Sequence, residues 1–123
     1  MANNYTDYSK NLMLGQIPTQ LYVSLHSADP TDVGSNQVAG TTRPVINLNA
    51  ATAGERQAQE AFVDITVPAG SDVAFIGLFD AASAGNFVAY APILDESGQP
   101  TVISFSQELP FRVTDPSIDL NNE

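Results

Sequence analysis

Hydrophobic and polar residues alternate along several short segments of the chain, and the first of these is residues 20–27, Gln-Leu-Tyr-Val-Ser-Leu-His-Ser. This alternation is typical of a β-strand with one buried face. Leu21, Val23 and Leu25 would point into a core. The residues between them, and His26 after them, would point to solvent.

Further apolar segments follow at intervals of about eight to twelve residues, separated by residues that favour turns. Residues 72–80 are apolar on both faces, which predicts a central strand that is covered on both sides. Gly77 lies in the middle of this strand and indicates either a bulge or the close approach of another segment. The pattern as a whole predicts seven strands, at 20–27, 45–51, 61–68, 72–80, 87–94, 101–106 and 109–115.

These strands predict an all-β fold, a single antiparallel β-sandwich of the jelly-roll or immunoglobulin-like kind. Residues 3–14 carry apolar side chains at intervals of three and four, which predicts a short amphipathic helix that Gly15 and Pro18 would end. Residues 28–44 and the polar residues 52–61 are expected to be loops. The expected organisation is one domain with an N-terminal helix or arm at 1–19, the sandwich at 20–115 and a C-terminal tail at 116–123.

The charge of the chain limits its partners. Among 123 residues, 4 are Lys or Arg and 14 are Asp or Glu, and the formal net charge is -10. A nucleic-acid surface needs clustered cations, and an anionic membrane would repel this chain, so neither partner is expected. The N-terminal residues do not resemble a signal peptide, which favours synthesis in a cytoplasm.

Few residues suit catalysis. The chain has no cysteine, which excludes disulfides, thiolate nucleophiles and cysteine-based zinc sites. The one histidine, His26, lies close to Asp29 in sequence, but no serine near it stands in a Gly-x-Ser-x-Gly motif. Asp29 and Asp32 do not have the spacing of a calcium-binding loop. We therefore expect a non-enzymatic protein with no metal and no cofactor.

The N-terminal segment carries apolar side chains that could face a partner. Tyr5, Tyr8 and the run Leu12, Met13 and Leu14 could dock onto a neighbouring chain, since Tyr and Met are frequent in interfaces. They could equally pack onto the sandwich of their own chain.

Two motifs resemble a family of small virion proteins of tailed bacteriophages. They are Leu-Tyr-Val-Ser-Leu-His-Ser-Ala-Asp-Pro at residues 21–30 and Phe-Ile-Gly-Leu-Phe-Asp-Ala-Ala-Ser-Ala-Gly-Asn-Phe at residues 75–87. Their order and spacing are similar to the family pattern over nearly the whole chain. The sequence departs from that pattern at residues 41–44, Thr-Thr-Arg-Pro, where the family often has Gly-Tyr-x-Arg-Gln. The candidate contact elements are the N-terminal segment and the loop at 27–44, and the candidate partner-binding residues are Tyr5, Tyr8, Leu12, Met13, Leu14 and Arg43.

The resemblance implies a structural component of the virion, assembled in the host cytoplasm and without enzymatic activity. The leading hypothesis is a capsid decoration (cement) protein that binds the major capsid protein or other virion proteins, as a homo-oligomer for which a trimer is favoured. The alternative is a tail component, namely a tail fibre, a fibre adaptor or a minor tail protein. In that role Tyr22 and Tyr90 could offer an aromatic platform for a host glycan.

Overall fold

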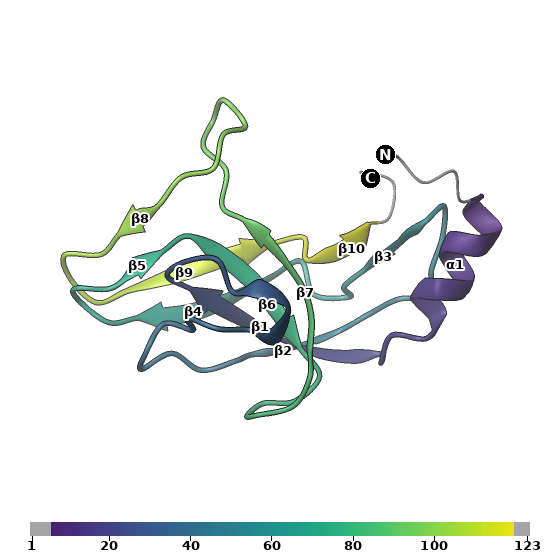
Figure 1. Ribbon diagram of the computed structural model, residues 1–123, viewed down its shortest axis with the longest axis horizontal. Helices are drawn as coiled ribbons and strands as arrows, with labels where there is room; N and C mark the ends of the chain where they lie inside the picture. Colours follow the sequence, from purple (N-terminus) through teal and green to yellow (C-terminus); the bar gives the residue numbers. More distant parts are fainter. Residues whose placement is uncertain (1–5, 120–123) are drawn as a thin grey trace.

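The computed structural model describes residues 6–119, which form an all-β fold with one short helix (Figure 1). The helix is α1 (Asp7–Gly15), and a 3-10 turn, η1 (Thr31–Val33), lies in the first long loop. The strands are β1 (Gln20–His26), β2 (Val45–Asn47), β3 (Glu55–Gln57), β4 (Phe62–Val67), β5 (Asp72–Val73), β6 (Phe75–Phe79), β7 (Phe87–Pro92), β8 (Ile103–Ser104), β9 (Leu109–Thr114) and β10 (Ser117–Asp119).

One four-stranded antiparallel sheet organises the fold, with the strand order β2-β1-β6-β7. The other strands form three two-stranded antiparallel sheets, β4 with β9, β10 with β3, and β5 with β8. The prediction of an all-β fold is confirmed. The single sandwich of about seven strands is not confirmed, because the strands divide among four sheets of unequal size.

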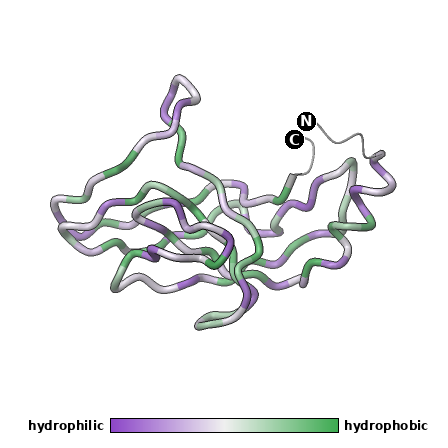
Figure 2. Tube along the Cα trace, viewed as in Figure 1, coloured by the Kyte–Doolittle hydropathy of each residue, from purple (hydrophilic) through white to green (hydrophobic). Residues whose placement is uncertain are grey.

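The main core lies between the inner face of the four-stranded sheet and the β4–β9 pair. In β4 every second side chain is buried, as alternation along a half-buried strand requires. In β1 the same alternation holds only at the start, and all four residues from Val23 to His26 are buried, so the prediction of a half-buried strand was wrong there. The apolar stretches in Figure 2 follow the strands, and the polar ones gather at turns. Within residues 6–119 no helix is both long and apolar enough to cross a membrane. The core includes Leu21, Val23, Leu25, Val63, Ile65, Val67, Leu78 and Val113.

Two strands differ from the main prediction. β3 lies inside the polar segment 52–61, for which a loop was favoured over one helical turn, and β10 lies inside the last residues, for which a tail or a short edge strand was expected. The two strands pair with each other over three residues, so that Ile118 lies opposite Arg56. Neither strand has the alternating apolar pattern of a half-buried strand, so the sequence alone does not predict it. The two strands are held instead by their pairing with each other and by the side chains of Arg56 and Ile118.

The helix α1 begins after Thr6, whose hydroxyl accepts a hydrogen bond from the backbone N–H of Ser9 at 3.2 Å. It ends at Gly15, as the sequence predicts, while the expected start at residue 3 lies outside the described residues. Leu14 is the buried residue of the helix. The helix packs beside β3, where the Asn11 side chain accepts a hydrogen bond from the backbone N–H of Gly54 at 2.9 Å.

Arg56 fastens the helix to the body of the protein. Its side chain is buried, with 6% of its surface exposed, and it donates hydrogen bonds to three carbonyl oxygens. One belongs to Asn49, and the other two, those of Leu14 and Ile17, lie at the carboxyl end of α1. A cation is favourable there because the unpaired carbonyl groups of a helix end carry partial negative charge.

Replacing Arg56 with alanine should lower the free energy of unfolding by roughly 2–3 kcal/mol, since hydrogen bonds from a charged group contribute about that much and the abandoned carbonyls stay buried. Urea unfolding followed by circular dichroism measures the loss. The matched control is Arg112→Ala, because Arg112 is an exposed arginine paired with Asp64 at 2.9 Å. A loss for Arg56→Ala no larger than that for Arg112→Ala would contradict the anchoring role.

Candidate functional site

The outer face of the four-stranded sheet carries a cluster of rings. The outward residues of β6 and β7 include Phe79, Phe87 and Tyr90, with ring centroids 4.9 Å apart for the first pair and 5.6 Å for the second. Phe75 continues the row beside Tyr90, at 6.2 Å. The loop after β1 covers one end of this row, where Gly34 lies against Phe79 and Phe87. The other end is open, and 45% of Tyr90 is exposed.

His26 lies inside this cluster and not on the surface, so the expectation of a solvent-facing histidine was wrong. None of its surface is exposed (0%). Its Nδ1–H donates to the carbonyl oxygen of Ser35 at 2.8 Å, which leaves Nε2 to accept from the hydroxyl of Ser24 at 2.7 Å. Alternation alone could not reveal this burial, because the covering residues come from the loop after β1 and from the β6–β7 hairpin.

Burial lowers the pKa of His26 below its usual 6.5, and the nearby Arg43 cation acts in the same direction. The hydrogen bond to the Ser35 carbonyl opposes this shift in the pKa. The imidazole is therefore neutral at pH 7, and both of its nitrogens are engaged in internal hydrogen bonds. It supports the loop over the sheet and has no free nitrogen with which to act as a base on a substrate.

Gly77 provides the space for this arrangement. A Cβ atom at Gly77 would lie 2.6 Å from a ring carbon of Phe87 and 2.8 Å from both Nε2 of His26 and the hydroxyl oxygen of Ser24. Of the two alternatives predicted for Gly77, the close approach of another segment is confirmed. The bulge of this hairpin lies further along, between Leu78 and Phe79.

Arg43 fixes the β6–β7 turn against the first long loop. Its guanidinium lies 3.5 Å from the centre of the Phe79 ring, a cation–π contact. It donates to the side chain of Gln37 and to the carbonyl oxygens of Ala81 and Ala84. Arg43 is thus occupied within its own chain.

The other candidate partner-binding residues differ in their exposure to solvent. Tyr8, Leu12 and Met13 are exposed, by 74%, 53% and 40%. Leu14 is buried on the body of the protein and is not available to a partner in this structure. Tyr5 lies outside the described residues. Three of the six candidates therefore form an exposed apolar patch on the helix.

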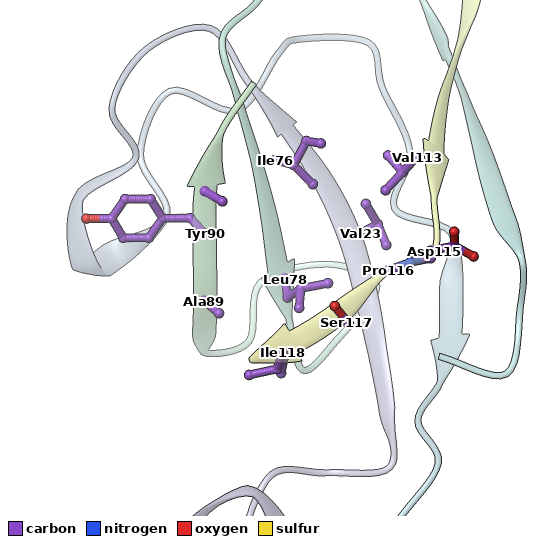
Figure 3. Close-up of a pocket in the computed structure, with 11 residues that line it drawn as sticks. Val23, Ile76, Leu78, Ala89, Tyr90, Val113, Asp115, Pro116, Ser117 and Ile118 are labelled. Atoms are coloured by element: carbon purple, nitrogen blue, oxygen red, sulfur yellow. The ribbon is translucent and has the colours of Figure 1, made fainter. Parts of the chain in front are cut away.

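A second surface was missed from the sequence. It is a groove of about 390 Å³ between β6–β7 and the β9–β10 corner. Figure 3 shows Ile76, Leu78 and Val113 around this groove, while the ring of Tyr90 points away from it. Ala89 and Ala91 of β7 also line it. The sequence feature that could have indicated this groove is the pair of small residues in β7, Ala89 and Ala91, which leave the apolar residues beside them uncovered.

Substituting Gly77 with alanine should destabilise the protein by about 1–3 kcal/mol, because the added methyl group overfills a packed site. The urea midpoint reports the change. Gly15→Ala is the matched control, since a Cβ at Gly15 would meet no atom within 4 Å. Equal stability of the two variants would exclude the close packing described here.

Acidification from pH 7.5 to 5.5 should lower the free energy of unfolding. The unfolded chain protonates His26 near pH 6.5, while the folded state resists protonation because its pKa is lowered. The unfolded state therefore binds more protons in this range. The carboxylates whose pKa is lowered, such as Glu60 and Asp80, start from ordinary values of 4.5 and 3.8 and act at lower pH.

The measurement is urea unfolding at several pH values for the natural protein and for His26→Asn. The variant should be less stable but should lose the decline above pH 5.5, because His26 is the one histidine of the chain. A natural protein whose stability is equal at pH 5.5 and 7.5 would contradict the burial of a neutral imidazole.

The described residues, 6–119, hold no group of three or more His, Cys, Asp or Glu side chains that could bind a metal ion. Among them, the larger polar networks serve turns and anchors. One example is Asp80, whose pKa is lowered because the backbone N–H and the side chain of Asn86 both donate to its carboxylate. The features that remain for interaction are the helix patch, the exposed rings and the groove.

Comparison with known protein families finds a match for this chain. The model of the family described as "Podophage GP4 fiber I protein gp80" matches residues 3–101, which is most of the chain. Among curated proteins, none matches this sequence. The match agrees with the resemblance to phage virion proteins and favours the tail-fibre alternative over capsid decoration. The protein is therefore a structural component of a phage virion, and the chain belongs to the gp80 family of podophage fibre proteins.

Proposed function

We propose that this protein is a non-enzymatic part of the tail-fibre apparatus, a small rigid domain that binds other virion proteins through its surface. The observation that carries the proposal is the fibre-family match over residues 3–101. The structure supports it in one respect. The histidine that offered the best candidate for catalysis is buried and hydrogen-bonded within the protein.

The exposed patch on α1 is the first candidate contact with a neighbouring chain. Tyr8 and Leu12 are one helical turn apart and both are largely exposed, with Met13 beside them. The helix itself is held in place by Arg56, so the patch is presented in a fixed orientation. A preordered surface loses less conformational entropy on binding than a flexible arm would. Self-association, with a trimer favoured, stays a prediction for this patch.

The placement on the particle can be tested by counting copies. In purified virions, quantitative mass spectrometry against the major capsid protein should give a count far below that of the capsid protein. Immunogold labelling should place the protein at the tail. A count comparable to that of the capsid protein, with label over the head, would reject the fibre assignment and restore capsid decoration.

A further inference from the structure

The strand β7 ends the four-stranded sheet and leaves one edge of its backbone unpaired. Its neighbour in the sheet is β6 alone. Among the described residues, no backbone hydrogen bond joins residues 87–92 to any other strand. Free edges of this kind are usually protected by charged side chains. The sequence of β7, Phe-Val-Ala-Tyr-Ala-Pro, contains none. Two features limit pairing, Pro92 at the end of the strand and the bulge at Val88 near its start, and the edge between them is free.

The apolar groove runs along the inner side of this free edge (Figure 3). It is open because the second layer of the fold is narrow. Residues of β4 and β9 share one core with those of β1, whereas β10 borders the groove and pairs with β3. Ile76 and Ala89 are only half-buried, and Ala91 is exposed. An added strand would place alternate side chains into the groove and would cover these residues.

The opposite face of the same edge is aromatic. Tyr90 projects away from the groove and is 45% exposed, with Phe87 and Phe75 packed against it. A strand paired with β7 would set its remaining side chains against Tyr90, where apolar and aromatic cross-strand pairs are favourable. Both faces of the edge therefore suit one extended segment.

Charge distinguishes between possible occupants. Asp115 lines the groove, and Asp95 lies shortly after β7 in the chain. Asp80, at the end of β6, is held across the hairpin turn by Asn86.

Among the described residues, no Lys or Arg lines the groove. Arg56 lies opposite the lining residue Ile118 and is engaged by carbonyl oxygens, and Arg112 precedes the lining residue Val113 and is paired with Asp64. The formal charge of the whole chain is -10, so a second copy would bring like charge to an acidic rim. A segment with basic ends is complementary to it.

We propose that β7 and the groove receive an extended segment of another virion protein, apolar at alternate positions and with Lys or Arg at its ends. The mode of binding is addition of a strand to a free sheet edge. About six residues of the partner would pair with β7, a length of roughly 20 Å. The virion origin of the partner rests on the proposed function, whereas the chemistry of the segment rests on the groove and its rim.

The test uses the photo-crosslinking amino acid p-benzoylphenylalanine in place of Tyr90, in the full chain assembled into virions. This substitution keeps an aromatic ring on the outer side of β7 and leaves the groove open. The matched control is the same amino acid at Phe62, which is also 45% exposed but lies on β4. After irradiation, mass spectrometry identifies the crosslinked peptides.

The expected product joins position 90 to one peptide of another virion protein that has alternating apolar residues and basic ends. The control at position 62 should not give that peptide. A crosslink to a second copy of this chain, a crosslink to an acidic or helical segment, or no crosslink at position 90 would each overturn the proposal.

A second variant tests the groove itself. Ala89→Phe places a ring in the groove and should lower the yield of the position-90 crosslink by about tenfold, a loss of 1.4 kcal/mol. Ala69→Phe, in an exposed turn between β4 and β5, should leave the yield unchanged. An equal yield in the two variants would also overturn the proposal. A crosslink to a suitable segment of the major capsid protein would instead support the binding mode and reject the fibre assignment.

Discussion

The packing of His26 over Gly77 is the constraint on which the rest of the structure depends. The glycine lets the imidazole, the Phe87 ring and the Ser24 hydroxyl approach the backbone of β6 within distances that any side chain would prevent. The same imidazole holds the Ser35 carbonyl, so the loop after β1 is fixed across the outer face. The sheet is thereby covered on both faces at its centre, which a short hairpin alone could not achieve.

Two of the four cations of this acidic protein, Arg43 and Arg56, hold separate segments of the chain together. Arg43 joins the first loop to the β6–β7 turn, and Arg56 joins the end of α1 to β3. Both donate to carbonyl oxygens, and Arg43 also stacks on a ring. Carbonyl oxygens suit a buried guanidinium because they can accept hydrogen bonds from the five N–H donors of the guanidinium. Each of these hydrogen bonds is strengthened by the positive charge of the donor. The surface is left acidic as a result, and any partner meets that charge.

The layers of the fold are unequal, and this inequality produces the surfaces that a virion protein can use. Four strands face two across the main core, so part of the inner face near β7 has no covering strand. The helix is likewise only partly covered, with Leu14 inward and Tyr8 and Leu12 outward. A domain with these two apolar surfaces can contact two neighbours at once, one at the helix and one at the sheet edge. This arrangement is consistent with a component of a fibre, where each domain must connect to others.

Local sequence patterns determined much of the fold. The alternation in residues 20–27 and 61–68 specified β1 and β4. The apolar segment 72–80 with its turn specified the β6–β7 hairpin, but the single strand expected there is divided into β5, which pairs with β8, and β6. These strands follow from their own residues because each buries its own apolar face. The two motifs also indicated a phage virion protein, and the fibre-family match agrees with them.

Tertiary structure alone decided the remaining features. β3 and β10 exist because they pair with each other, and the burial of His26 depends on the path of the loop after it and on Phe79 and Phe87, which are far from it in sequence. The free edge of β7 was also hidden, since its apolar residues are equally typical of a central strand. A side chain's own pattern tells which way it points along a strand. What covers it is determined by other segments, because burial is a property of contacts between distant parts of the chain.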